Sequence, residues 1–375
     1  MELTNESAPW YVVHNVNKLD SPCLVVYLDR VKANIKLVKA MAGNVQRLRP
    51  HVKTHKTKEA AVLLLEAGMT KFKCATIAEA EMLAQIKAPD VLLAYQPVGP
   101  KAERYLALLK QYPQTKFSCL VDIAFAAKQL SGMAVQHNRS LDVYIDLNVG
   151  MNRTGTTPDK KAVALYQLCA ELPGINPAGL HVYDGHIVDS DFHVRTEKCN
   201  AAFAPVEQLK GMLVANGFQE PVIIAGGSAT FPIHLKQDGV ECSPGTFIFW
   251  DAGYSQLLPE QPFQPAALVV TRIISLPDER TICTDLGHKS VASENVLSRR
   301  VLFLNAPELT VIGHSEEHLV LKAEATHNYK IGDVLYGLPF HICPTCALYD
   351  HAVVIEDNEA KTEWKIVARD RKLTV

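Results

Sequence analysis

The segment RPHVKTHKT, residues 49–57, gathers basic side chains and histidines at the end of a short apolar run. We expect that run, residues 47–52, to form the first strand of a barrel. Barrel enzymes place catalytic groups at the C-terminal ends of their strands, so Lys53 would point into the barrel mouth. The surrounding cations and histidines would lower the pKa of Lys53 and make it a better imine-forming nucleophile. Spacing alone also allows a solvated basic loop.

From about residue 47 to residue 250, short apolar runs alternate with amphipathic stretches. This pattern is typical of α/β folds, and eight such units favour closure into a (β/α)8 TIM-type barrel of about 200 residues over a doubly wound sheet. Thr76 and Glu79 form a capping box at the start of one helix. The expected strands are 47–52, 72–75, 91–95, 117–121, 142–147, 179–183, 222–225 and 246–250. The expected helices include 57–67, 78–86, 101–111 and 194–215.

After Pro262 the pattern changes to strands separated by turns. The expected strands are 266–276, 280–285, 318–324, 333–338 and 352–356. We also expect the apolar run 23–28 to join them. The chain is therefore predicted to contain a barrel over 26–258 and a β domain over 259–375 together with residues 1–25.

Composition limits the classes of function. The chain has 375 residues, of which 48% are hydrophobic, and its net charge of −2 argues against a nucleic-acid partner. No apolar run approaches the roughly 20 residues that a membrane span needs. The first 15 residues show no secretory signal. Nine cysteines, an odd number without framework spacing, indicate reduced thiols and a cytoplasmic location.

Two segments suit a phosphate-bearing ligand. GGSAT, residues 226–230, follows the seventh expected strand, and SPGT, residues 243–246, precedes the eighth. Glycines let backbone N–H groups approach a phosphate, hydroxyls add donors, and barrels commonly bind phosphate after strands seven and eight. Each motif alone is weak because Gly-Ser turns are common.

The segment FHICPTC, residues 340–346, places His341 and Cys343 two positions apart in the expected β domain. On an extended strand both side chains would share one face, and imidazole with thiolate suits Zn²⁺ or other transition metals. Cys343 and Cys346 also form a CxxC, which allows a redox pair or a closed zinc site. A buried histidine among small core cysteines is the alternative.

Two further segments end expected strands. In DLNVGMNRTG, residues 146–155, the turns at Gly150 and Gly155 would let Arg153 reach an anionic ligand atom; a surface arginine is the alternative. In HVYDGH, residues 181–186, Tyr183 and His186 could flank a ring or move a proton, whereas His181 is expected in the core.

Together these segments resemble the D-threonine aldolase and D-serine dehydratase family, within the alanine-racemase-like (fold type III) pyridoxal phosphate enzymes. The resemblance runs from about Ser21 to Asp350, and RPHVKTHKT is its most specific element. It implies that Lys53 rather than Lys56 carries the cofactor. It also implies that Arg153 contacts the phenolic oxygen of the cofactor. Racemases usually have a tyrosine at the position of Trp250, so the chain departs from them at the outermost phosphate contact.

The resemblance implies two sets of site residues and a metal pair. The cofactor-binding residues are Lys53, Arg153, Tyr183, Gly227, Ser228, Gly245, Thr246 and Trp250. The candidate catalytic residues are Lys53, His51, Tyr183 and His186. His341 and Cys343 would hold a divalent metal ion, Zn, Mn or Mg.

The implied function is a pyridoxal phosphate- and divalent-metal-dependent lyase acting on a small-molecule D-β-hydroxy amino acid. Retro-aldol cleavage would give glycine and an aldehyde, and β-elimination would give an α-keto acid and ammonia. We favour D-threonine aldolase; the alternatives are D-serine dehydratase, D-threo-3-hydroxyaspartate dehydratase or a non-catalytic cofactor-binding protein. A homodimer is expected to close the site, bringing Asp285 or Lys289 near.

Overall fold

The computed structural model describes residues 9–375 and divides the chain into two compact units. The first, the β unit, comprises residues up to Asn34 together with 248–256 and 263–366. The second, the barrel unit, comprises 35–247, 257–262 and 367–375. Helix α1, Leu28–Ala42, continues from one unit into the other.

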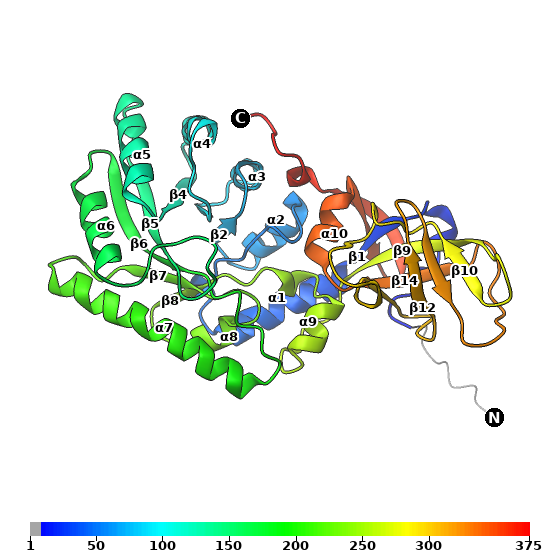
Figure 1. Cartoon of the computed structure of the whole chain (residues 1–375). Coiled ribbons are helices and arrows are strands. Elements are labelled where there is room, and N and C mark those ends of the chain that lie inside the picture. The colour runs from blue at the N-terminus through cyan, green and yellow to red at the C-terminus, as the bar shows by residue number, and fades with distance from the viewer. Residues whose placement is uncertain (1–8) are drawn as a thin grey trace. The chain divides into compact units, whose positions relative to one another are not determined.

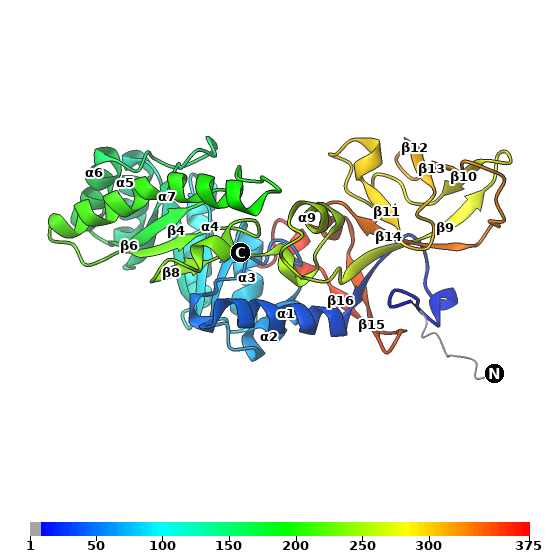
Figure 2. The ribbon, with the colours of Figure 1, turned by 90° about the horizontal axis from the view of Figure 1, so that it is seen from below.

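The barrel unit is built on a parallel sheet whose strands follow one another in chain order. Between the strands the chain forms helices, of which α5, α6 and α7 lie on the outer side of the strands (Figures 1 and 2). The strands within residues 9–375 are β2 Lys71–Cys74, β3 Asp90–Leu93, β4 Lys116–Val121, β5 Leu141–Leu147, β6 Ile175–Val182, β7 Val222–Ala225 and β8 Val240–Cys242. The helices are α2 Lys58–Glu66, α3 Ile77–Gln85, α4 Pro100–Gln111, α5 Ala124–Gln136, α6 Lys160–Glu171, α7 Phe192–Ala215 and α8 Phe231–His234.

Residues 48–52 join the two edges of this sheet. Leu48 forms a parallel bridge with Cys242 of β8, and His51 forms a parallel bridge with Lys73 of β2. Arg49 N donates to Cys242 O at 2.8 Å, and Val52 N donates to Lys73 O at 3.0 Å. The expected first strand is therefore present as an irregular strand between β8 and β2, and the predicted barrel fold is confirmed.

The prediction of a strand at residues 246–250, the last one expected in the barrel, is wrong. Residues 246–250 begin with a 3-10 helix, Thr246–Ile248, and the eighth strand position is taken by β8. Phe247, Phe249 and Trp250 are each about 1% exposed, so the apolar run reflects burial rather than strand pairing. A short apolar run bounded by turn residues does not distinguish a strand from a buried turn.

Local signals at helix starts were informative. The Oγ1 atom of Thr76 accepts from Glu79 N at 3.1 Å, so Thr76 caps α3 as predicted. Thr57 caps α2 in the same manner. These caps fix where each helix leaves the C-terminal end of the preceding strand.

The β unit contains a nine-stranded mixed sheet within residues 9–375. β1 is parallel to β15 and antiparallel to β9, so the N-terminal run joins this sheet as expected. β14 pairs with both β9 and β11. The strands are β1 Cys23–Tyr27, β9 Ala267–Ser275, β10 Thr281–Thr284, β11 Val301–Phe303, β12 Thr310–His314, β13 Leu319–Lys322, β14 Val334–Pro339, β15 His351–Glu356 and β16 Glu359–Lys365. The unit also contains α10 Ile342–Leu348 and all of α9 Ala252–Leu257 except its last residue.

The C-terminal segment 367–375 belongs to the barrel unit. Ala368 N donates to Lys56 O at 3.1 Å, and Thr374 N donates to the carboxylate of Glu81 on α3 at 3.1 Å. Arg104 on α4 donates to the carbonyl oxygens of Arg371 and Val375 at 3.0 and 2.9 Å. The segment is thus held against α3 and α4 (Figure 1).

Within residues 9–375, no helix is both long enough and apolar enough to cross a membrane.

Candidate active site

The barrel unit has a cavity of about 600 Å³ at the C-terminal ends of its strands, here called the mouth cavity. Ala75 follows β2, Tyr95 follows β3 and Asp122 follows β4. The ionisable or aromatic residues that line it are His51, Lys53, Lys73, Tyr95, Asp122, Asp146, Arg153, His181 and Tyr183. Lys53, His51, Arg153 and Tyr183 were predicted from the sequence, and the structure brings these four together.

The lysines considered as cofactor carriers differ in their partners. Lys53 lines the mouth cavity, and among the described residues its ammonium group has no carboxylate within ion-pair distance. Lys56 is ion-paired with the buried carboxylate of Glu79. In the β unit, Lys289 is exposed and ion-paired with Glu316 at 2.7 Å. Lys53 is therefore the one of these three amines that faces the cavity without a neutralising acid.

The electrostatic surroundings of Lys53 differ from the expected cluster of cations. Arg49 is fully buried and pairs with Asp90 at 2.6 Å and Glu241 at 2.9 Å, which neutralise its charge. Burial lowers the pKa of His55 to about 3, so this imidazole is neutral. Burial, then the charges of Lys53 and Lys73, hold the pKa of His51 well below its ordinary value.

A second lysine, Lys73 in the middle of β2, also lines the mouth cavity. It is 4% exposed, and its Nζ lies 5.6 Å from the centre of the Tyr183 ring. Burial, followed by the charge of Lys53, lowers the pKa of Lys73 to about 7. The sequence carried a usable signal, because a lysine inside an expected barrel strand is seldom buried without a function.

Asp146 and His181 form a buried pair at the ends of β5 and β6. Asp146 Oδ1 lies 2.6 Å from His181 Nδ1. Burial alone would raise the pKa of Asp146, but the hydrogen bond to His181 holds it below its ordinary value. His181 Nε2 is buried and has no hydrogen-bond partner among the described residues. His181 is buried as expected, but it also lines the mouth cavity, which we did not predict.

Arg153 and Tyr183 lie next to each other at the cavity wall. The guanidinium carbon of Arg153 is 4.9 Å from the centre of the Tyr183 ring. Gly150 and Gly155 have φ values of 121° and 99°, which favour glycine, and they shape the loop that carries Arg153. A Cβ at Gly155 would lie 2.5 Å from Asn148 N, so a larger residue would displace this loop.

The two glycine-rich segments are in contact. Ser228 Oγ accepts from Thr246 N at 3.2 Å and from Gly245 N at 3.4 Å. A Cβ at Gly245 would lie 2.8 Å from His51 O, so this loop also packs against the segment that carries Lys53. Ser243 Oγ is buried and has no hydrogen-bond partner among the described residues.

His186 and Trp250, like the predicted residues of the two glycine-rich segments, do not line the mouth cavity. His186 is exposed, and its ring packs over Gly150, where a Cβ would lie 2.6 Å from Nε2. Trp250 belongs to the β unit and is 1% exposed. Its ring stacks on Tyr254 with the ring centres 5.4 Å apart.

The predicted metal pair lies in the β unit, but not on an extended strand. His341 is the N-cap of α10 and Cys343 lies in its first turn. The extended conformation considered for His341 and Cys343 is absent, because Asp251 Oδ2 accepts from Ile342 N at 3.0 Å and fixes a helix start there. His341 and Cys343 are nevertheless hydrogen-bonded to each other.

Glu294 was missed by the sequence analysis. Its Oε1 lies 2.5 Å from His341 Nδ1. Burial alone would lower the pKa of His341, but the hydrogen bonds to Cys343 and Glu294 raise it to about 9. A carboxylate on one ring nitrogen commonly orients a metal-binding histidine, leaving the other nitrogen for the ion. The loop carrying Glu294 lacked any motif that could have indicated this contact.

The structure also brings together three groups that the sequence did not single out. Ligand atoms of Asp184, Cys199 and His234 lie within 4.8 Å of one another and are buried. Asp184 Oδ2 lies 2.7 Å from His234 Nε2, and Thr230 Oγ1 donates to Asp184 Oδ1 at 2.7 Å. A Cβ at Gly226 would lie 2.8 Å from the His234 ring. This cluster therefore packs against the loop 226–230. Its carboxylate, thiol and imidazole are ligand types that a metal ion could use.

Comparisons with known proteins agree with this geometry. Residues 26–252 match the model of the alanine racemase N-terminal domain, and residues 266–355 match a putative serine dehydratase domain. D-threonine aldolase from Arthrobacter sp is 31% identical over 94% of this chain and 93% of the relative's length. The chain belongs to this alanine-racemase-like family.

Other members support the assignment. The 3-hydroxy-D-aspartate aldolase of Paracoccus denitrificans (strain Pd 1222) is 26% identical over 95% of this chain and 93% of the relative. The crystal structure of D-threonine aldolase from Filomicrobium marinum has a TM-score of 0.86 at 26% identity, and the match covers 93% of this chain and 95% of that one. The family recognised from the sequence is confirmed.

The residues present fit the pyridoxal phosphate of alanine-racemase-like enzymes. The mouth cavity offers the amine of Lys53 and the buried, unpartnered Nε2 of His181. The glycine-rich loops pack against His51 through Gly245 and offer the unpartnered hydroxyl of Ser243, while Gly245 N and Thr246 N are bonded to Ser228 Oγ. An amine that can form a Schiff base and glycine-rich loops that can approach a phosphate are groups that suit such a cofactor.

Proposed function

We propose that this protein is a pyridoxal phosphate- and divalent-metal-dependent lyase that cleaves D-threonine to glycine and acetaldehyde. The observation that carries the proposal is the mouth cavity. There Lys53 lies with Lys73, Arg153 and the Asp146–His181 pair at the strand ends of a chain 31% identical to a D-threonine aldolase. Ionisable groups with shifted pKa values at this end of a barrel are typical of catalysis.

Pyridoxal phosphate, when bound, supplies an electron sink for negative charge that develops on the substrate. In the proposal, Lys53 holds the cofactor through its amine and Arg153 binds its phenolic oxygen. Gly227, Ser228, Gly245 and Thr246 hold the phosphate through backbone N–H groups and hydroxyls. Trp250 is proposed as an outer contact of the cofactor.

Proton transfer is assigned to side chains of the cavity. His51 is held neutral by its surroundings and can accept a proton from the substrate. Its Nδ1 accepts from Lys53 N at 3.3 Å, which fixes the ring beside the lysine. Tyr183 supplies a hydroxyl on the same wall. His186, which is exposed, is the weaker candidate of the predicted set.

The metal ion, Zn, Mn or Mg, is assigned to His341 and Cys343. Glu294 would orient His341 through Nδ1. A divalent ion supplies Lewis-acid chemistry to a hydroxyl group and lowers its pKa.

A second candidate function is β-elimination, as a D-serine or D-threo-3-hydroxyaspartate dehydratase. The His341–Cys343 pair favours it, because a thiolate with an imidazole selects zinc. A small cofactor-binding protein without lyase activity would lack the β unit that this chain has.

Product analysis separates these functions. The protein, loaded with pyridoxal phosphate and Zn²⁺ or Mn²⁺, is incubated with D-threonine, D-serine and their L-enantiomers. The proposal expects glycine and acetaldehyde from D-threonine alone among the four. A keto acid with ammonia would establish the dehydratase. Turnover of neither D-substrate, with the cofactor chromophore present, would contradict both.

We also propose a cytoplasmic homodimer. All nine cysteines are free thiols, and six of them are buried, which suits a reducing compartment. Recovery of the protein from its source with intramolecular disulfides would contradict this location.

A further inference from the structure

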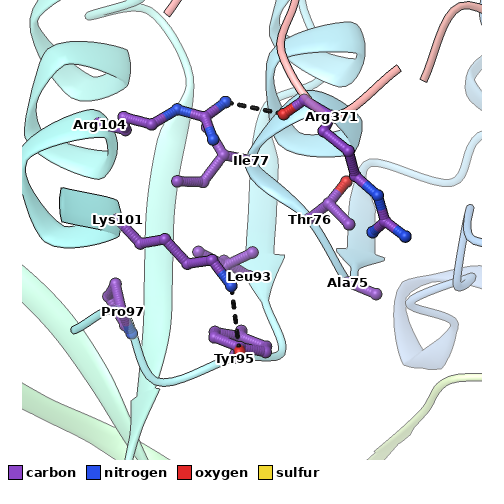
Figure 3. A pocket seen from close by; sticks show the side chains of 9 residues that line it. All are labelled: Ala75, Thr76, Ile77, Leu93, Tyr95, Pro97, Lys101, Arg104 and Arg371. Carbon is purple, nitrogen blue, oxygen red and sulfur yellow. Dashed lines mark hydrogen bonds between the residues drawn. The ribbon is translucent and has the colours of Figure 1, made fainter. Parts of the chain in front are cut away.

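A second cavity, of about 360 Å³, opens beside the mouth cavity in the barrel unit and is here called the cationic cavity. Ala75 and Tyr95, which follow β2 and β3, line both cavities. In Figure 3, Lys101 and Arg104 of α4 lie on one side of it, with Lys101 reaching Tyr95, and Ala75, Thr76 and Arg371 lie on the other side. The two cavities therefore share a part of their wall at Ala75 and Tyr95.

The cationic cavity has three positive side chains and no acidic one among its lining residues. Lys101 Nζ donates to the hydroxyl of Tyr95 at 3.2 Å and lies over its ring at 4.4 Å from the centre. The guanidinium of Arg371 has no ion-pair partner among residues 9–375. Lys101 and Arg371 thus face one small space without a neutralising carboxylate.

Arg104 has a different part in this arrangement. It donates to the carbonyl oxygens of Arg371 and Val375, so its charge holds the C-terminal segment on α4 (Figure 3). Thr374 is tied to the buried Glu81 of α3 in addition. These contacts fix the backbone of Arg371 at the edge of the cavity.

The remaining wall is apolar, formed by Ile77, Leu93 and Pro97. A volume of about 360 Å³ lies at the lower end of the range for small-molecule sites, about 300–1,000 Å³. The cavity therefore has room for a substituent that carries negative charge at its end. A methyl group, such as the one on the β-carbon of threonine, would leave both cations without a partner.

We propose that the cationic cavity is a subsite for a carboxylate on the β-carbon of the substrate, bound by Lys101 and Arg371. This inference rests on the proposed lyase function. It makes a D-β-hydroxy amino acid with a second carboxylate, D-3-hydroxyaspartate, a better substrate than D-threonine. Arginine and lysine bind carboxylates through charge-assisted hydrogen bonds, which are stronger than neutral ones.

The test compares kcat/KM for D-3-hydroxyaspartate and D-threonine in the loaded protein. The wild type is expected to prefer D-3-hydroxyaspartate. Lys101→Met and Arg371→Met should each lower the ratio of the two kcat/KM values by about tenfold, which corresponds to the loss of one charge-assisted hydrogen bond. Lys110→Met is the matched control, since Lys110 lies on the same helix and does not line the cationic cavity. Its ratio should equal that of the wild type.

Salt gives a second readout. Lys101 and Arg371 are exposed, so the preference for D-3-hydroxyaspartate should weaken as ionic strength rises from about 0.05 to about 0.5 M, where the screening length falls below about 10 Å. Equal losses for both substrates in Lys101→Met and Arg371→Met would indicate a structural role and overturn the subsite. So would a wild type that cleaves D-threonine but shows no preference. A wild type that cleaves neither substrate would instead contradict the proposed function.

Discussion

Lys53, Lys56 and Lys73 differ in what surrounds their amines. Lys56 is neutralised by Glu79, whereas Lys53 and Lys73 face the mouth cavity together. The sequence predicted Lys53 through a family motif, and the structure supports it over Lys56. The sequence analysis did not single out Lys73, although a lysine inside an expected strand was a usable signal. That its amine lies in the same cavity as Lys53 could not be predicted, because the two residues come from different strand positions that meet only once the barrel closes.

Covalent trapping checks the assignment. Reduction of the holoprotein with borohydride, followed by tryptic digestion, should place the pyridoxyl group on the peptide with Lys53. Lys53→Ala should lose both the chromophore and the activity, and Lys56→Ala should keep the chromophore. A labelled peptide carrying Lys73 or Lys56 would contradict the assignment.

Lys73 should impose a pH dependence near neutrality. Its pKa is lowered from 10.5 to about 7, so the amine is neutral above pH 7 and becomes a buried ammonium below it. That ammonium repels Lys53, so we expect kcat/KM for D-threonine to rise through an inflection near pH 7. Lys73→Met should remove this inflection. Lys73→Arg, charged at every pH, should be impaired throughout, and an unchanged inflection in Lys73→Met would contradict the role.

The same shift affects stability with a definite sign. Between pH 7 and 10.5 the unfolded chain holds a proton on Lys73 that the folded chain has released. Stability contributed by this group therefore rises with pH across that window, by up to about 1.4 kcal/mol per pH unit. Relative to Lys73→Met, the wild type should gain stability from about pH 7.5 to about pH 9.5 in urea unfolding measurements.

For the strands and helices, the spacing of apolar runs and a helix cap predicted most of the barrel. Apolar runs located β2 to β7 to within a few residues, and the capping box at Thr76 located the start of α3. In two segments the extended conformation considered from the sequence is absent, for one physical reason. Residues 246–250 and 340–346 are apolar because they are buried, and their conformations are set by distant contacts, such as that of Asp251 with Ile342 N. An apolar run in the sequence indicates that a segment is buried, but it does not indicate which distant residues contact that segment.

Helix α10 gives different roles to its two cysteines. Cys343 is hydrogen-bonded to His341, whereas Cys346 is fully buried. Chelation should remove lyase activity and leave the cofactor bound, because separate residues hold the two groups. Cys343→Ala should keep the chromophore and bind metal at least about tenfold more weakly, an effect comparable to loss of a supporting contact in zinc sites.

Cys346→Ala is the control for that variant. It should retain metal affinity and lose about 1 kcal/mol of stability, because a buried sulfur is removed. Metal content by elemental analysis, chromophore absorbance and turnover are measured on the same samples. Full activity in protein shown to be metal-free would contradict the metal role of His341 and Cys343.

For the whole molecule, the sequence indicated a barrel and a β-rich region, but not how the chain passes between the compact units. Residues 367–375 belong to the barrel unit through Glu81, Arg104 and Lys56. Each of these contacts joins residues more than 250 positions apart in the chain. No local period or motif marks such pairs, so their partners emerge only from the folded structure.

The barrel mouth also has an exposed apolar rim. Tyr95 and Val98 follow β3 and are 44% and 45% exposed, and Ile123 and Phe125 at the start of α5 are 55% and 65% exposed. Asp122, immediately before them, lines the mouth cavity. Exposed apolar side chains grouped around a site commonly mark a protein interface. A second copy of the chain is the occupant that the proposed homodimer provides.

A charged side chain introduced into this rim should therefore dissociate the dimer and lower the activity in parallel. We expect sedimentation of the wild type to give a dimer at assay concentrations, and Phe125→Glu to shift it toward monomer with a parallel loss of kcat/KM. Val135→Glu is the matched control, because Val135 is 53% exposed in the last turn of the same helix, about 15 Å along it from Phe125. The Val135→Glu variant should remain dimeric and active.

An active monomeric wild type would contradict the homodimer. A dimer unaffected by Phe125→Glu would place the interface elsewhere, because an interface that buries roughly 800 Å² on each chain rarely tolerates an unpaired charge at its centre.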